Sequence, residues 1–266
     1  MATAHVNGID LFYEVQGEGP PLLLISGLGL SSLAWAAALP QLTGQFTCIT
    51  VDNRGTGRSQ TPPGPYPIDE MANDMAGLIE HLDLGPVPVV GWSLGGSVLQ
   101  ALLINHGNLI DRGVLLSAFP SYTRLQHAWL DAGLAVRRHG LDAATIALNG
   151  LAWSYTPRLL SDHGAAGAQA ELVAQAPYPT SLEGFEAQAA GLRVYDSRAD
   201  LPKVTRPVLV LVGAEDVLTP VAQSVEMARL IPGARLQVLP RGGHAMVLEY
   251  PTDTLTPVVE YLQKAS

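Results

Sequence analysis

The stretch that most constrains the fold of this chain is Val87–Gly96, which reads VPVVGWSLGG. An apolar, β-branched run leads into a Gly-X-Ser-X-Gly pentad, and a helical pattern of apolar residues follows directly. This order predicts a buried strand, a sharp turn with Ser93 at its tip, and a helix whose N-terminus favours negative charge. The pentad alone can arise by chance in a chain rich in glycine. The predicted strand before it and the predicted helix after it argue against chance.

The rest of the chain alternates between strand and helix patterns. Asn7-Gly8 lies between two short strand patterns and predicts an antiparallel hairpin. Continuous apolar runs then alternate with helical patterns, as in parallel strands covered on both faces. The predicted strands are 5–6, 9–15, 22–25, 46–51, 87–90, 113–117, 207–213 and 234–239. The predicted helices include one through 35 to 42, and others over 68–84, 221–230 and 252–262. We therefore expect an α/β fold with a mostly parallel, eight-stranded sheet and helices on both faces.

Between the sixth and seventh predicted strands the pattern changes. Residues 120–201 contain helical stretches and no buried strand. We interpret this segment as a helical cap, inserted after the sixth strand and lying over the end of the sheet. The prediction divides the chain into a core domain, 1–119 and 202–266, and a cap, 120–201.

Composition limits the classes of function. The chain has 266 residues, which suits one domain with a moderate insertion, and no apolar stretch reaches the ~18 residues of a membrane span. Cys48 is the single cysteine, so no intrachain disulfide and no multi-cysteine metal site can form. The N-terminal residues lack the pattern of a secretory signal. A formal net charge of −9 argues against nucleic-acid binding. We expect a cytoplasmic protein without cofactor, metal or membrane partner; the sequence leaves a homodimer open.

Four loops follow predicted parallel strands and should meet at one rim of the sheet: Ser26–Leu30, Trp92–Leu94, Ala214–Thr219 and Gly242–Ala245. The third loop offers two carboxylates. We favour Asp216 over Glu215, because Thr219 followed by Pro220 suits the start of the next helix and leaves Asp216 free.

His244 follows two glycines in the fourth loop, which gives the order Ser93, Asp216, His244 along the chain. In acyl transfer His244 takes the proton of Ser93, and Asp216 holds the imidazole in the required tautomer. The backbone N–H groups of Leu28 and Leu94 are the predicted donors to the oxyanion.

With these motifs the chain resembles the α/β-hydrolase superfamily over essentially its whole length. The resemblance rests on Gly91–Gly95, the loop Asp52–Ser59, Gly213 with Asp216, and Gly242-Gly243-His244. The pattern is most similar to the branch of 3-oxoadipate enol-lactonases, aminoacrylate hydrolases and carboxylesterases. The resemblance implies a capped serine hydrolase that acts on a small-molecule ester or lactone through an acyl-enzyme.

One position departs from the family. Its first loop commonly begins His-Gly, whereas this chain has Ser26-Gly27, which is also similar to carbon–carbon bond hydrolases. Hydrolysis of a C–C or C–N bond by the same triad therefore stays an alternative. A ligand-binding protein with a degenerate site is a second one.

Other patterns have simpler explanations. Gly55-Thr56-Gly57 lacks the third glycine of a dinucleotide-binding loop, and a proline-rich stretch follows it. We expect Asp52 and Arg54 to pair with each other and fix this loop. Four tryptophans are candidates for the substrate pocket: Trp35, Trp92, Trp129 and Trp153.

Overall fold

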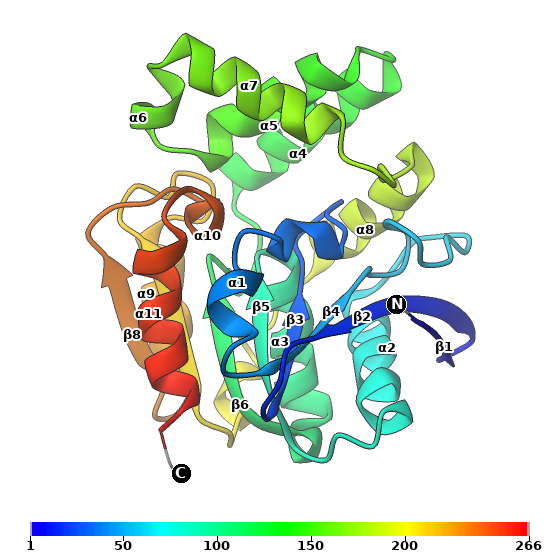
Figure 1. Ribbon diagram of the computed structural model, residues 1–266, viewed down its shortest axis with the longest axis vertical. Helices are drawn as coiled ribbons and strands as arrows, with labels where there is room; N and C mark the ends of the chain where they lie inside the picture. The colour runs from blue at the N-terminus through cyan, green and yellow to red at the C-terminus, as the bar shows by residue number, and fades with distance from the viewer. Residues whose placement is uncertain (1, 265–266) are drawn as a thin grey trace.

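The computed structural model describes residues 2–264 and contains one eight-stranded sheet. In space the strands follow the order β1-β2-β4-β3-β5-β6-β7-β8 (Figure 1). The strand β2 pairs antiparallel with β1 and β4, and all other neighbours are parallel. The predicted α/β fold and mostly parallel sheet are thus confirmed. The strands are β1 (Ala2–Val6), β2 (Ile9–Gln16), β3 (Pro21–Ile25), β4 (Thr47–Val51), β5 (Val87–Trp92), β6 (Ile110–Leu116), β7 (Val208–Gly213) and β8 (Arg235–Leu239).

Helices cover both faces of the sheet, and each face has its own hydrophobic cluster. Successive side chains of a strand point to opposite faces, so in β3 Leu23 joins one cluster and Leu24 the other. Helices α2 (Ile68–His81), α3 (Leu94–Asn105) and α9 (Val221–Leu230) contribute to the first cluster. Helices α1 (Leu39–Leu42), α10 (Met246–Glu249) and α11 (Pro251–Leu262) contribute to the second.

The chain between β6 and β7 is helical, as predicted, and forms a cap above the sheet (Figure 1). Helices α4 to α7 lie at the top of the view, and α8 lies lower, between them and the sheet. They are α4 (Arg124–Arg138), α5 (Ala143–Ser154), α6 (Pro157–Leu160), α7 (His163–Ala174) and α8 (Leu182–Val194). The division at residues 120 and 201 stays a prediction.

The helix predicted through Trp35 to Leu42 is broken. The structure has a short 3-10 helix, η1 (Ser32–Trp35), and a separate α1 over Leu39–Leu42. Pro40 explains the break, because proline has no N–H to donate to the residue four positions earlier and its ring clashes with that carbonyl. Two further 3-10 turns, η2 (Gly107–Leu109) and η3 (Leu201–Lys203), precede β6 and β7.

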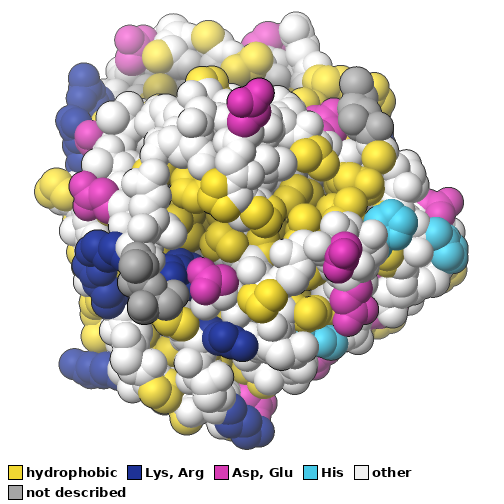
Figure 2. Space-filling model, turned by 60° about the horizontal axis from the view of Figure 1, so that its bottom comes forward, with side chains coloured by type: hydrophobic (Ala, Val, Ile, Leu, Met, Phe, Trp, Pro, Cys, Tyr) yellow, Lys and Arg dark blue, Asp and Glu magenta, His cyan; other side chains and the backbone are white. Residues whose placement is uncertain are grey.

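The face at the bottom of Figure 1 comes forward in Figure 2. Hydrophobic side chains gather near its middle. Lys and Arg lie mostly to the left of them and below, His lies to the right, and Asp and Glu occur on both sides. Within residues 2–264 no helix is both long and apolar enough to cross a membrane.

Candidate active site

Ser93 lies at the tip of the turn between β5 and α3, as the sequence predicts. Its φ of 56° and ψ of −116° are unusual for a residue with a side chain, a type of strain that is common at functional sites. A Cβ on Gly91 would lie 2.3 Å from the carbonyl oxygen of Gly95, and one on Gly95 would lie 2.1 Å from that of Ile25. Both flanking positions therefore require glycine.

The structure brings the side chains of Ser93, His244 and Asp216 into one hydrogen-bonded row. His244 Nε2 lies 2.9 Å from Ser93 Oγ, and His244 Nδ1 lies 3.1 Å from Asp216 Oδ2. Asp216 follows β7 and His244 follows β8, so the rim of the sheet collects them from loops far apart in sequence. His244 and Asp216 are about 5 % exposed or less, which shields the row from solvent.

Thr219 belongs to this row, although its place before Pro220 predicts the start of a helix. The N-cap of α9 is Pro220. The Thr219 hydroxyl instead donates to Asp216 Oδ2 at 2.6 Å and lies 3.0 Å from His244 Nδ1. The backbone N–H groups of Leu218 and Thr219 donate to Asp216 Oδ1 at 3.0 and 2.7 Å. These donors fix the carboxylate plane with Oδ2 toward the imidazole.

Glu215, the other carboxylate of this loop, has a different partner. Its Oε2 accepts a hydrogen bond from the Gly242 N–H at 2.9 Å, and the residue is exposed. It therefore ties the third loop to the fourth and stays outside the hydrogen-bonded row. His244 is held by its backbone as well, since Trp92 Nε1 donates to its carbonyl at 3.0 Å.

The loop Ser26–Leu30 lies against the turn at Ser93. A Cβ on Gly27 would lie 3.3 Å from Ser93 Cβ. Leu30 N–H donates to Gly27 O at 3.2 Å, which closes a turn with Leu28 and Gly29 at its centre. Within residues 2–264, neither the Leu28 N–H nor the Leu94 N–H donates a hydrogen bond to another group of the protein. Both predicted donors are therefore available to a ligand.

Ser26, which replaces the family's usual histidine, is fully buried. Its hydroxyl donates to Ser31 O at 3.1 Å, and its carbonyl accepts from Asn53 Nδ2 at 3.1 Å. Both bonds hold the loop itself.

The expected pairing of Asp52 with Arg54 is wrong. The Arg54 guanidinium binds Asp74 through two hydrogen bonds of 2.6 Å, and both side chains are almost fully buried. Asp52 accepts instead from the Ser32 N–H at 2.6 Å and from the Arg58 N–H at 2.8 Å. The carboxylate that pairs with Arg54 thus comes from Asp74, 20 positions away in sequence, and the spacing of residues within the loop does not reveal it.

The four tryptophans differ in position. Trp35 and Trp92 are buried in the cluster on one face of the sheet and meet edge to face, with ring centroids 6.2 Å apart. Trp129 and Trp153, in the cap, are half-buried. Trp129 packs against a small cluster of four buried residues, against which Leu28 also packs: Leu130, Leu134, Phe185 and Ala189. Trp129 and the predicted oxyanion loop therefore pack against the same group of side chains.

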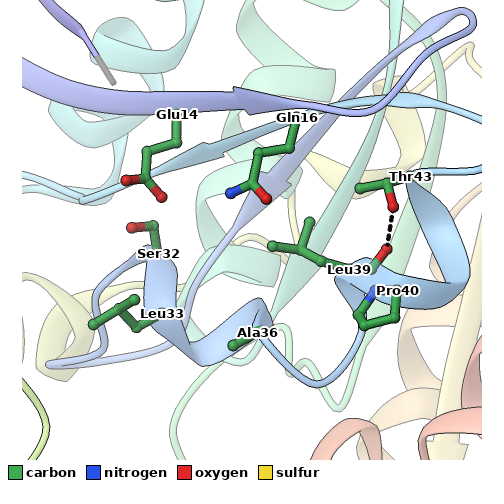
Figure 3. Close-up of a pocket in the computed structure, with 8 residues that line it drawn as sticks. All are labelled: Glu14, Gln16, Ser32, Leu33, Ala36, Leu39, Pro40 and Thr43. Carbon is green, nitrogen blue, oxygen red and sulfur yellow. Dashed lines mark hydrogen bonds between the residues drawn. The ribbon is translucent and has the colours of Figure 1, made fainter.

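A pocket of about 350 Å³ lies between β2 and the segment of η1 and α1 (Figure 3). Ser93, Asp216 and His244 are not among its lining residues, so this pocket is separate from the candidate site. The lining residues are Glu14, Gln16, Ser32, Leu33, Ala36, Leu39, Pro40 and Thr43. Across the described residues, no group of three or more His, Cys, Asp or Glu side chains is arranged to hold a metal ion.

Comparison with known proteins gives the family. The family model for the alpha/beta hydrolase fold matches residues 20–251. A relative named "Putative carbamate hydrolase RutD", from Caulobacter segnis, is 32% identical over 280 residues and covers 100% of both chains. The crystal structure of the enol-lactonase from Burkholderia xenovorans superposes with a TM-score of 0.88 at 27% identity, covering 99% of this chain and 100% of the other. The structure of a thermophilic esterase from Thermogutta terrifontis superposes with a TM-score of 0.85 at 30% identity, covering 99% of this chain and 98% of the other. The chain belongs to the alpha/beta hydrolase fold family.

Proposed function

We propose that this member of the family is a serine hydrolase that cleaves a carboxylic ester or lactone through an acyl-enzyme on Ser93. The observation that carries the proposal is the buried row from Ser93 Oγ through His244 to Asp216, with links of 2.9 and 3.1 Å. A nucleophile, a base within hydrogen-bond reach and a group that orients the base are the parts that acyl transfer requires.

In the first half-reaction Ser93 Oγ attacks the carbonyl carbon, and its proton passes to His244 Nε2. The oxygen of the carbonyl becomes an oxyanion, to which the N–H groups of Leu28 and Leu94 donate. The intermediate collapses when the bond to the leaving oxygen breaks, and that oxygen takes the proton from His244. The acyl group is then an ester of Ser93.

In the second half-reaction water attacks this ester and gives a proton to His244, which returns it to Ser93 as the carboxylic acid leaves. Asp216 and Thr219 both lie next to Nδ1, so they keep the Nδ1–H tautomer and leave Nε2 free to accept the proton.

The names of the relatives support an oxygen leaving group. An enol-lactonase and an esterase are both similar to this chain over nearly its whole length. The two activities break the same acyl–oxygen bond, in a ring or in an open chain.

Hydrolysis of a C–N bond is the second candidate, because the relative from Caulobacter segnis is named as a carbamate hydrolase and matches the full chain. The same row of residues would serve it, with nitrogen in place of oxygen as the leaving atom.

A substrate panel separates the two candidates. It contains p-nitrophenyl esters of increasing acyl length, γ- and δ-lactones, an enol-lactone and an alkyl carbamate. We expect turnover of an ester or lactone that is lost in Ser93→Ala and strongly reduced in Asp216→Asn.

Glu215→Gln is the matched control, since its carboxylate lies in the same loop but bonds to Gly242. It should retain the activity. Turnover of the carbamate with all esters and lactones inert would favour the second candidate. Tight ligand binding without any turnover would indicate a degenerate binding protein.

A further inference from the structure

Helix α8 of the cap is seated directly on the core. A Cβ on Gly184 would lie 2.1 Å from Gly55 O, and one on Gly191 would lie 1.8 Å from Tyr66 O. The Tyr66 N–H also donates to Ala187 O at 3.0 Å. Two glycines thus let the helix backbone approach the loop after β4 far more closely than any side chain would allow. Side chains on this face of α8 therefore have fixed positions relative to the core.

Gln188 lies on this face and is fully buried. Its Oε1 accepts a hydrogen bond from the Gly29 N–H at 3.0 Å, and its Nε2 donates to Arg54 O at 2.8 Å. One amide therefore bridges the predicted oxyanion loop and the loop after β4, on which α8 is seated. The bridge needs a donor and an acceptor at the end of one side chain, which a carboxylate or a hydrocarbon chain does not provide.

The bond to Gly29 selects one conformation of the turn. Gly29 has a φ of +66° at the third position of the turn that begins at Gly27, as in a type II turn. Types I and II differ in the orientation of the central peptide, here the one between Leu28 and Gly29. The N–H of this peptide, which belongs to Gly29, points to Gln188 in the type II turn and would point away from it in a type I turn. Thr180, just before α8, holds the next peptide by donating to Gly29 O at 2.9 Å.

We propose that Gln188 is a positioning residue: from the cap it holds the Leu28–Gly29 peptide, next to the peptide that carries the Leu28 N–H, so that the oxyanion loop keeps its position beside Ser93 only while α8 is seated. The inference rests on the proposed function, because it needs Leu28 as an oxyanion donor. Gln188 itself does not touch substrate. Its contribution appears in the transition state, when charge develops on the oxygen that Leu28 faces.

The test replaces the amide by an apolar chain of similar length, Gln188→Met. Removal of one oxyanion donor typically lowers kcat by about 10²- to 10³-fold, and misalignment of one donor should cost about 10- to 100-fold. We expect this fall in kcat with KM within about 2-fold. A trifluoromethyl ketone inhibitor, whose adduct with Ser93 carries an oxyanion, should bind more weakly by the same factor as kcat falls.

Gln169→Met is the matched control. This glutamine also lies in the cap, but its amide donates to the Tyr155 hydroxyl at 3.0 Å and not to the oxyanion loop. It should leave kcat, KM and inhibitor affinity unchanged. A Gln188→Met enzyme with the wild-type kcat overturns the proposal, as does one that loses kcat while its affinity for the inhibitor stays the same.

If Gln188→Met does not fold, Gln188→Glu replaces it, because it keeps the acceptor for Gly29 and loses only the donor to Arg54. We expect Gln188→Glu to retain kcat and inhibitor affinity within about 10-fold. A folded Gln188→Glu enzyme with unchanged inhibitor affinity and a larger loss of kcat overturns the proposal. If the wild type itself turns over no ester or lactone, the proposed function has failed. If the wild type is active and Gln188→Met matches it, only the role of Gln188 has failed.

Discussion

Thr219 offers a sharp test of how the imidazole is oriented. Thr219→Val keeps the shape of the side chain and removes its hydroxyl, which donates to Asp216 at 2.6 Å and lies 3.0 Å from His244 Nδ1. The carboxylate keeps three partners, namely the two backbone N–H groups and the imidazole. The triad should therefore stay assembled but be less firmly held.

The size of the effect follows from the bonds that are lost. A hydrogen bond to a charged group contributes about 1.5–3 kcal/mol. This bond matters most in the transition state, when the imidazole is protonated, and each 1.36 kcal/mol is a factor of ten in rate. We expect kcat to fall by about 10- to 150-fold, with KM nearly unchanged.

The assay is steady-state hydrolysis of the best ester or lactone, with the thermal unfolding midpoint measured on the same samples. Thr219→Ser is the control, since it keeps the hydroxyl and should retain most of the activity. This role of the Thr219 hydroxyl is refuted if the kcat of Thr219→Val stays within 2-fold of the wild-type value. It is refuted equally if Thr219→Ser loses as much activity as Thr219→Val.

Two further predictions concern stability. Asp74→Ala removes two of the hydrogen bonds of the buried Arg54 guanidinium and leaves Glu70 as its remaining carboxylate partner. It should lower the free energy of unfolding by about 3 kcal/mol in urea titrations, the low end for breaking a buried ion pair; a change below about 1 kcal/mol would contradict it. Burial raises the pKa of the Cys48 thiol from 9.0 to about 11. As the pH rises above 9, the unfolded chain loses this proton before the folded chain does. The stability that the protonated thiol contributes is therefore complete below pH 9 and is lost as the pH rises through 11. Denaturant titrations of wild type and Cys48→Ala should diverge over this range, and parallel curves would exclude the effect.

The fold and the candidate site differ in how far local patterns predict them. The strand ends could be predicted because buried runs are long and distinct, and Ser93, Asp216 and His244 each follow one of them. A rule about where parallel strands end is enough to bring these three together. The continuous helix predicted through Trp35 to Leu42 is wrong, because the apolar spacing that suggests it carries no information on the N–H that Pro40 lacks.

The supporting residues could not be predicted in the same way. Thr219 and Gln188 bind partners 25 and 159 positions away, and no local spacing encodes such pairs. Gln188 does leave one signal. It lies between Phe185 and Leu192 on the apolar face of α8, where a polar side chain needs a buried partner.

Intact-protein mass spectrometry with a fluorophosphonate probe tests whether Ser93 is the nucleophile. We predict that the wild type gains the mass of one probe, that the modified peptide contains Ser93, and that Ser93→Ala gains none. A wild type that hydrolyses substrate but is not labelled, or a Ser93→Ala variant labelled to the same extent, would contradict the account.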